Sequence, residues 1–454
     1  MPRTPNDRGK PWIAAAPDSW GRLHRVAAWV LLGNWAGGST VPSRTLYPHQ
    51  WSWDSAFIAI GLRHLSPRRA GRELETLFAA QWADGRVPHI VFNDSVPADA
   101  YFPGPDFWQA GVPGEAGLIN TSGIIQPPVH ALAAWEVHRT DPNDSLDRGF
   151  LHRLYPRLAA WHDYLLGPRD LGGSGLASIV HPWESGMDNS PCWDSPLARI
   201  APADPGSYER RDLTHSDAAD RPTDLDYGRY VRLCTDYRDH DYDDARTEHA
   251  FAVEDPCLNG LLAASEYALA DIAEAIGKDP GFHRARAQAI TAALLERLYD
   301  PESGLFRCRD LRADGADGSG ALIGEGSVAG LVPLIVPDLP ESVVRSLLDT
   351  LRGDNFALGR VHMVPSYDLT GPAFDPARYW RGPSWFNVGW LLHRGLRSYG
   401  ATLDAKRLRE DLLEAAGRTG FAEYVDPHTG DGRGIRSFSW TAATALDLIA
   451  EGAD

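Results

Sequence analysis

Apolar residues recur along most of this chain at the three-to-four-residue spacing of amphipathic helices. One such face is formed by Leu258, Leu261, Leu262, Leu269, Ile272 and Ile276. This spacing matches the 3.6-residue period of a helix. Asp255-Pro256 precedes the face and Gly277 follows it, and these residue types begin and end helices. The pattern predicts a helix from Pro256 to Gly277.

The same periodicity predicts helices elsewhere, at about 19–35, 66–82, 126–139, 147–166, 287–298, 325–336, 343–351, 384–399, 404–417 and 439–450. Val and Ile rarely alternate with polar residues, so we expect strands to be few and short. About a dozen helices without an exact repeat, separated by long loops, favour an all-α fold. Helix pairs would run in and out around a ring, as a helical toroid with long loops over one end.

Residues 194–253 differ from the rest of the chain because they are rich in Asp, Arg and Tyr and poor in apolar runs. No Pro/Ser-rich linker divides the chain, so we predict one domain spanning residues 1–454. We interpret residues 194–253 as a long loop excursion of that domain. Long ordered loops in compact domains are usually functional; the alternative is a surface insertion.

Charge and composition exclude several functions. The 44 Lys and Arg against 61 Asp and Glu give a net charge of −17, which argues against nucleic acid or an anionic membrane as the main partner. No apolar stretch approaches the roughly 20 residues of a membrane span, and the first residues show no apolar signal region. The 4 Cys lack C-x-x-C spacing, so we expect reduced thiols and a cytoplasmic protein.

No metal or cofactor is expected. The sequence has no H-E-x-x-H zinc motif and no phosphate-binding P-loop. The acidic run 239–244 lacks the Gly and the terminal Glu of a calcium loop, so we interpret it as a solvated face.

Aromatic residues and a carboxylate crowd together in the first candidate site segment, which contains Tyr47, Trp51, Trp53 and Asp54. Flat indole rings can cover the C–H face of a sugar, and a nearby carboxylate can accept hydrogen bonds from its hydroxyls. The alternative is a buried aromatic cluster in which Asp54 is the N-cap of the following helix.

A second segment, His181 to Asp194, contains Trp183, Glu184, Gly186 and Asp188. Its Gly and Pro residues predict a loop. Neighbouring aromatic rings would partly desolvate a carboxyl there, which raises its pKa and suits it to donate a proton. The alternative is a turn with exposed acids.

Two further segments combine aromatic and polar residues on predicted loops. Residues 379–385 contain Tyr379, Trp380, Gly382 and Trp385, and residues 421–430 place Glu423 before a turn; Trp440 follows at the start of the last predicted helix. Carboxylates set among aromatic rings on loops of a helical toroid are what glycoside hydrolysis requires, because two carboxyls must flank the bond that breaks.

At these segments the chain resembles glycoside hydrolase family 63, in particular its glucosylglycerate and mannosylglycerate hydrolases. Further matching stretches are 88–92, 101–105, 126–130 and 221–224, in the same order. The resemblance implies an (α/α)6 barrel and an inverting mechanism. It assigns Asp188 as general acid, Glu423 as general base and Asp54 to the hydroxyls of the glycone.

The resemblance also implies that glycerate is held by residues matching Tyr47, Tyr101, Gln126, Arg221 and Tyr379, with Tyr227 nearby. A guanidinium can bind a carboxylate through two hydrogen bonds, which suits Arg221 to bind the carboxylate of glycerate. Because Arg221 lies within residues 194–253, that excursion is expected to cover the active site as a lid.

We therefore expect an inverting α-glycosidase whose small-molecule substrate is 2-O-α-glucosylglycerate or mannosylglycerate, split into hexose and glycerate. The glucosylglycerate enzymes have Gln where this chain has Phe438, which leaves the hexose and the aglycone open. The alternatives are a broader α-glucosidase acting on trehalose or kojibiose and a non-catalytic sugar-binding toroid. Whether the chain forms a homo-oligomer, a dimer or a tetramer, is also open.

Overall fold

The computed structural model describes residues 17–115, 117–213, 218–315 and 318–452. Six helical elements form a closed inner ring in which each packs against the next. In chain order they are α2 (Ser52–Leu62), α5 (His130–Thr140), α10 (Pro256–Ala275), the pair of 3-10 helices η5 (Val328–Gly330) and η6 (Val332–Ile335), α13 (Phe386–Ser398) and α15 (Ser439–Glu451). Helix α15 packs back against α2, which closes the ring.

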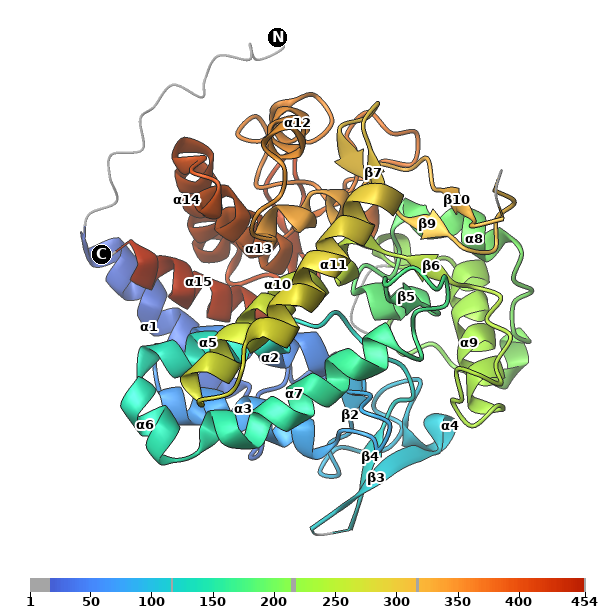
Figure 1. Ribbon diagram of the computed structural model, residues 1–454, viewed down its shortest axis with the longest axis horizontal. Coiled ribbons are helices and arrows are strands. Elements are labelled where there is room, and N and C mark those ends of the chain that lie inside the picture. Colours follow the sequence, from blue (N-terminus) through green and yellow to red (C-terminus); the bar gives the residue numbers. More distant parts are fainter. Residues whose placement is uncertain (1–16, 116, 214–217, 316–317, 453–454) are drawn as a thin grey trace.

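A second set of helices alternates with the inner elements along the chain and lies outside them. These outer helices are α1 (Pro17–Gly33), α3 (Pro67–Ala79), α7 (Phe150–Leu166), α11 (Gly281–Arg297), α12 (Glu341–Arg352) and α14 (Thr402–Thr419). The first of them, α1, packs against the last inner helix, as the neighbouring blue and red ribbons in Figure 1 show.

Burial explains which helices are inside. Every residue of α2 is buried, as are most residues of α10, whereas α12 buries only Val343, Val344, Leu347 and Leu351. A helix that is apolar all round must be enclosed by others, while one with a single apolar face lies at the surface. One hydrophobic cluster runs through nearly all of these helices.

Further helices and short strands fill the connections. The helices are α4 (Pro105–Trp108), α6 (Pro142–Asp147), α8 (Asp194–Ala198), α9 (Asp224–Arg238), and the 3-10 helices η1 (Pro182–Ser185), η2 (Pro191–Trp193), η3 (Pro205–Ser207), η4 (Ala218–Asp220) and η7 (Tyr379–Arg381). The strands are β1 (Gln50–Trp51), β2 (Ile90–Val91), β3 (Ala110–Gly114), β4 (Gly117–Thr121), β5 (Ser178–Ile179), β6 (Val253–Glu254), β7 (Tyr299–Asp300), β8 (Leu305–Phe306), β9 (Arg309–Asp310), β10 (Ala321–Leu322), β11 (Ser384–Trp385), β12 (Tyr424–Val425) and β13 (Gly432–Arg433).

The strands of the described residues are short, as expected, since the longest, β3 and β4, have 5 residues each. They are not few, because the connections contain β1 to β13. The strands form small antiparallel sheets in the orders β1-β2-β4-β3, β10-β9-β6-β5 and β11-β12-β13, with a separate β7-β8 pair. The first three sheets contain or flank loop segments singled out from the sequence.

One predicted helix is wrong. Residues 325–336 form the two 3-10 helices η5 and η6 instead of one α-helix. Pro333 lacks the N–H that an α-helix needs there. Gly330 lies so close to its neighbour that a Cβ would stand 2.1 Å from the carbonyl oxygen of Phe306. The helix predicted at 126–139 begins later, at His130, because Pro127 and Pro128 precede it.

The segment 194–253 is only partly loop, because it contains the 15-residue helix α9. The buried face of α9 consists mainly of tyrosines, which an apolar count overlooks: Tyr227, Tyr230 and Tyr237 are buried with Val231 and Cys234. Thr223 caps the helix by accepting a hydrogen bond from the amide of Asp226 at 3.2 Å.

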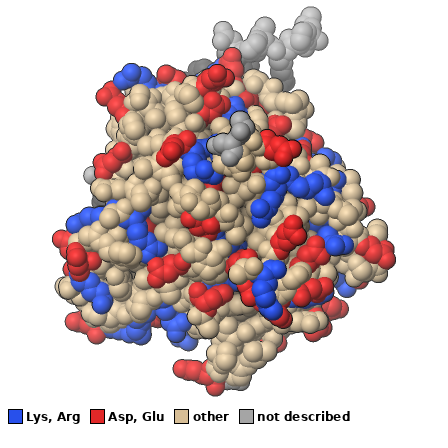
Figure 2. Space-filling view, turned by 45° about the vertical axis from the view of Figure 1, so that its right-hand side comes forward, with Lys and Arg blue, Asp and Glu red and all other residues tan. Residues whose placement is uncertain are grey.

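The acidic run 239–244 is also not a uniformly solvated face. Asp239 and Asp241 are exposed, but the side chain of Asp244 is only 5 % exposed and pairs with Arg86 and Arg169. Figure 2 shows acidic and basic side chains intermixed over one face of the molecule, without a large patch of one sign. No helix in the described part of the chain is long and apolar enough to cross a membrane.

Candidate active site

The segments singled out from the sequence meet at one cavity of about 780 Å³, counting its opening to solvent. Its lining includes the first turn of α2, the start of α15 and residues just before α5 and α13, so it lies at the N-terminal ends of inner helices. The lining residues are Pro42, Leu46, Tyr47, Trp51, Trp53, Asp54, His89, Tyr101, Gln126, Trp183, Gly186, Asp188, Asp212, Arg221, Pro222, Tyr227, Tyr379, Trp380, Glu423, Phe438 and Trp440.

Every predicted site residue except Gly382 and Trp385 lines this cavity. Those two lie behind the wall. The indole of Trp385 stacks on that of Trp380, with ring centroids 3.8 Å apart and planes within 2°. The amide of Gly382 donates to Ser366 Oγ at 3.1 Å, and a Cβ at this glycine would stand 2.4 Å from the carbonyl oxygen of Asp375. Both residues therefore support the lining rather than form it.

Asp188 is presented by a tight loop that follows η1. Gly186 ends η1 in the left-handed region, with φ of 69°, and a Cβ there would lie 2.5 Å from the ring of Trp53. Ser185 Oγ accepts from the amide of Met187 at 2.9 Å. The carbonyl oxygen of Asp188 accepts from the hydroxyl of Tyr230 at 2.6 Å. Glycine is thus required for the loop to pack on Trp53 while holding Asp188 in the cavity wall.

The surroundings of Asp188 favour its protonated form. Burial raises the pKa of Asp188 to about 7, and the charges of Glu423 and Asp212 add to this effect, while its own backbone amide and Arg221 oppose it. A carboxyl with such a pKa still holds its proton near neutral pH and can donate it to a leaving group.

Glu423 lies in the cavity just before β12 and accepts three hydrogen bonds. The hydroxyls of Tyr47 and Tyr379 each donate to its Oε1 at 3.1 Å, and the amide of Ile435 donates to Oε2 at 3.2 Å. Burial raises the pKa of Glu423, whereas Arg221 and these three donors lower it. The donors stabilise the carboxylate form, which is the form that removes a proton from water.

Arg221 supplies a positive charge in the same cavity. Its guanidinium is buried, donates to the Tyr47 hydroxyl at 3.1 Å and lies 4.6 Å above the ring of Tyr379. Arg221 therefore stands beside the partners of Glu423. An anionic group entering the cavity would meet a guanidinium that Tyr47 and Tyr379 already orient.

Asp54 lies in the first turn of α2 and is 3 % exposed. Trp51, not Asp54, occupies the N-cap position, so the N-cap alternative for this carboxylate is wrong. Burial raises the pKa of Asp54 well above its ordinary value, and the charge of Glu423 raises it further. Gln126 is fixed beside it, because its Oε1 accepts from the amide of Trp53 at 3.1 Å.

Several lining residues were not predicted. Leu46, Pro42 and Pro222 add apolar walls, and His89, whose pKa burial lowers to about 3, is neutral beside the ring of Trp183. Asp212 also lines the cavity and pairs with Arg210 at 2.7 Å. It belongs to residues 203–220, where the sequence offers no motif, so no signal in the sequence indicates that Asp212 lines a cavity.

The arrangement combines a proton donor, a carboxylate stabilised by donors, a cation and aromatic walls in one cavity. Together these groups can carry out acid–base chemistry on a polar, ring-shaped ligand with an anionic substituent. Within the described residues no group of three or more His, Cys, Asp or Glu is placed to hold a metal ion.

Comparisons with known proteins agree with this chemistry. Residues 47–441 match the model of the mannosylglycerate hydrolase MGH1-like glycoside hydrolase domain. A mannosylglycerate hydrolase of Rubrobacter radiotolerans is 43 % identical, over 94 % of this chain and 96 % of that protein. A glucosylglycerate hydrolase of Mycolicibacterium hassiacum is 36 % identical, over 94 % and 98 %. The crystal structure of a family 63 mannosylglycerate hydrolase from Thermus thermophilus in complex with Tris and D-glycerate is 40 % identical, covers 94 % of this chain and 99 % of that one, and superposes with a TM-score of 0.85.

Proposed function

This chain belongs to the mannosylglycerate hydrolase MGH1-like glycoside hydrolases of family 63, and we propose that it hydrolyses an α-hexosylglycerate to hexose and glycerate. The observation that carries the proposal is the shared cavity of Asp188, Glu423 and Arg221. The first two provide a proton donor and a proton acceptor, and the third provides a partner for a carboxylate. A neutral disaccharide offers no carboxylate for the Arg221 guanidinium to bind.

In the proposed reaction, Asp188 gives its proton to the glycosidic oxygen as the bond from this oxygen to the anomeric carbon breaks. Glu423 takes a proton from the water that attacks the anomeric carbon from the opposite face. After each turnover Glu423 gives its extra proton to solvent, and Asp188 takes a proton back from solvent. This route inverts the anomeric configuration, and it requires about 6.5–9.5 Å between the two carboxyl groups to admit the water.

The aglycone would lie on the side of Arg221. Its carboxylate would accept hydrogen bonds from the guanidinium, while Tyr47, Tyr101, Gln126, Tyr227 and Tyr379 surround it. The hexose would lie over Asp54, whose carboxyl can hydrogen-bond to ring hydroxyls. The indoles of Trp51, Trp53, Trp183, Trp380 and Trp440 would cover its apolar face.

The relatives favour mannose as the hexose. The mannosylglycerate hydrolases among them are 39–43 % identical to this chain, against 36 % for the glucosylglycerate hydrolase. Phe438, which lines the cavity, adds an apolar surface beside the glycone. We therefore propose mannosylglycerate as the better substrate and glucosylglycerate as the second.

We further propose that the fold is an (α/α)6 barrel in which η5 and η6 take the place of one inner helix. The closed ring of inner elements and the alternating outer helices support this. The segment 194–253 contributes Asp212, Arg221 and Tyr227 to the cavity, which supports its proposed role as a lid. A cytoplasmic location and a homo-oligomeric state remain predictions from the sequence.

A hydrolysis panel tests the function. Purified protein would be given mannosylglycerate, glucosylglycerate, trehalose and kojibiose, and released hexose would be measured for each. The proposal expects kcat/KM to be at least about 100-fold higher for a glycerate glycoside than for either neutral disaccharide, since hydrogen bonds from the Arg221 guanidinium to a carboxylate would contribute about 1.5–3 kcal/mol each. Equal or higher activity on trehalose or kojibiose would replace it with a broader α-glucosidase, and tight sugar binding without product would indicate a non-catalytic protein.

A further inference from the structure

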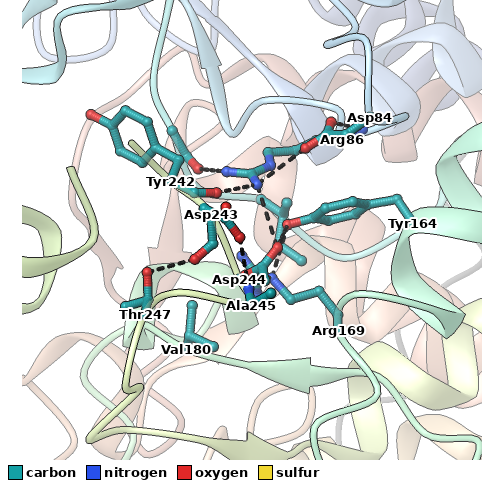
Figure 3. A network of polar contacts seen from close by, with 12 residues as sticks. Asp84, Arg86, Tyr164, Arg169, Val180, Tyr242, Asp243, Asp244, Ala245 and Thr247 are labelled. Carbon is teal, nitrogen blue, oxygen red and sulfur yellow. Dashed lines mark hydrogen bonds and ion pairs between the residues drawn. The ribbon is translucent and has the colours of Figure 1, made fainter. Parts of the chain in front are cut away.

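A buried network of charged residues lies directly behind the cavity wall and does not line the cavity. At its centre, Arg169 and Asp244 form an ion pair at 2.9 Å, and Arg86 approaches the other oxygen of Asp244 at 3.4 Å. The hydroxyls of Tyr164 and Tyr237 donate to Asp244 at 2.7 and 2.6 Å. Figure 3 shows Arg86, Tyr164 and Arg169 converging on Asp244.

Arg169 connects this centre to the loop of Asp188 through Glu184. Its Nη1 and Nη2 donate to the two carboxylate oxygens of Glu184, each at 2.7 Å, and both side chains are fully buried. Such a two-bonded pair fixes the orientation of both groups as well as their distance. Glu184 lies in η1, four residues before Asp188.

Glu184 also connects two separate segments of the chain that form this part of the cavity wall. Its carboxylate accepts from the amide of Val180 at 2.7 Å and from the amide of Ile125 at 3.2 Å. Ile125 precedes Gln126, which lines the cavity. Arg86 holds the same stretch from the other side, because its Nη1 donates to the carbonyl oxygen of Gly123 at 2.7 Å.

In the buried part of this network two guanidinium groups, of Arg86 and Arg169, face two carboxylates, of Glu184 and Asp244. Arg86 also pairs with the exposed Asp84 at 3.2 Å. Replacing a buried ion pair by apolar residues is often neutral or stabilising, so such a pair is weak evidence for a role in stability alone. The pair of Arg169 and Glu184 fixes the direction of the backbone of η1, which contains the cavity-lining Trp183 and leads through Gly186 to Asp188.

We propose that Glu184, held by Arg169 and Asp244, is a positioning residue that aims the Asp188 carboxyl at the glycosidic oxygen without touching the substrate. The inference rests on the proposed role of Asp188 as proton donor. Misplacement of a catalytic group by about 1 Å can cost about 100-fold in rate. Loss of the pair would therefore slow the step that needs proton donation and leave the other steps nearly unchanged.

The test compares two leaving groups in Glu184→Gln, which keeps the shape of the side chain but removes its charge and one acceptor. Glycerate needs a proton in order to leave, whereas fluoride leaves an α-mannosyl or α-glucosyl fluoride without a proton donor. We expect kcat on the hexosylglycerate to fall about 10- to 100-fold and kcat on the matching fluoride to change by less than about 3-fold, with KM values near those of the wild type. A looser loop also admits water to Asp188, which lowers its pKa, so the alkaline limb of the kcat/KM profile should move to lower pH.

Glu266→Gln is the matched control. Glu266 is equally buried and pairs with His162, His283 and Arg286 between α7, α10 and α11, away from the cavity lining. This variant should lower the melting temperature without any dependence on the leaving group. Should Glu184→Gln fail to fold, Tyr164→Phe decides, because it removes only a hydroxyl that accepts from Arg169 at 2.9 Å and donates to Asp244. We expect Tyr164→Phe to lower kcat about 2- to 5-fold on the hexosylglycerate and to leave kcat on the fluoride unchanged.

Equal losses on both substrates, or no loss on either, in the folded variant would overturn the inference. Asp188→Asn separates this failure from a failure of the proposed function. If Asp188→Asn hydrolyses the fluoride selectively while Glu184→Gln shows no selectivity, only the positioning role is wrong. If Asp188→Asn slows both substrates equally, Asp188 is not the proton donor and the proposed function itself fails at this residue.

Discussion

Replacing Arg221 by Met removes the buried cation from the cavity while keeping a side chain of similar length. In the native protein the guanidinium is 4 % exposed and is fixed by the Tyr47 hydroxyl and the Tyr379 ring, so little ordering is needed when a carboxylate binds. Hydrogen bonds to charged groups contribute about 1.5–3 kcal/mol each. A loss of about 3 kcal/mol in transition-state binding corresponds to about 150-fold in kcat/KM.

The assay measures Arg221→Met on a hexosylglycerate and on the matching α-hexosyl fluoride, which carries no carboxylate. At each substrate's pH optimum we expect kcat/KM to fall roughly 150-fold on the hexosylglycerate and less than about 5-fold on the fluoride. Arg232→Met is the control, because it changes the net charge equally but Arg232 is on the surface of α9 and does not line the cavity.

The pH profile of the same variant provides an independent check. Arg221 lowers the pKa of both Glu423 and Asp188, so its removal raises both pKa values. Glu423 must be ionised to act as base and Asp188 protonated to act as acid. Both limbs of the bell-shaped kcat/KM profile should therefore move to higher pH. Equal losses on the two substrates, or a shift to lower pH, would refute the assignment of Arg221.

Three further predictions follow from the site. Asp188→Asn and Glu423→Gln should each lower kcat on the hexosylglycerate at least about 1000-fold with an unchanged circular dichroism spectrum, and wild-type-like turnover in either would remove that residue from the mechanism. Gly186→Ala forces a Cβ within 2.5 Å of Trp53 at a positive φ, so it should cost about 1–3 kcal/mol of unfolding free energy and lower kcat more than about 10-fold; an active variant of native stability would contradict the packing. Because the folded-state pKa of Asp188 is raised to about 7, this residue reduces stability as pH rises from about 4 to 7. Asp188→Asn should thus be more stable than the wild type at pH 8 by about 1–3 kcal/mol but not at pH 4, and thermal unfolding at the two pH values that showed no difference would contradict the raised pKa.

The cavity was predictable from the sequence because its carboxylates and aromatic residues occur together in short segments. Asp54, Asp188 and Glu423 each stand within a few residues of a tryptophan or tyrosine, and each such segment interrupts a helical pattern. That combination predicts a desolvated carboxylate on a loop, as the structure shows for Asp188 and Glu423, whereas Asp54 lies in the first turn of α2. The family resemblance then joined segments that lie far apart in the chain, and the structure brings them to one cavity.

Other parts of the site could not be found this way, because they depend on tertiary packing. Asp212 becomes an ordered lining residue only through its pairing with Arg210, and nothing in its neighbours sets it apart. Asp244 stands in a run whose other aspartates, Asp239, Asp241 and Asp243, are exposed or partly exposed, yet it is buried against Arg86 and Arg169. A run of charges shows no periodicity that would distinguish its buried member.

The helices likewise divide into those that the local sequence pattern predicts and those that depend on tertiary packing or backbone constraints. Helices with Leu and Ile at helical spacing, such as α10, appeared close to their predicted bounds. Helix α9 was missed because tyrosines form its buried face, and the helix predicted at 325–336 was broken by Pro333 and by the close approach of Gly330 to Phe306. Burial of tyrosine side chains explains the first difference, and backbone constraints at Pro333 and Gly330 explain the second.

The central claim, that Asp188 and Glu423 hydrolyse an α-hexosylglycerate by direct attack of water, is tested most directly by the anomer first released. Proton NMR would follow the wild-type reaction from its first minutes, before mutarotation, with Glu423→Gln in parallel. The account predicts that the β-hexose appears first and that Glu423→Gln releases neither anomer at a measurable rate. Initial release of the α-hexose, or undiminished release by Glu423→Gln, would contradict it.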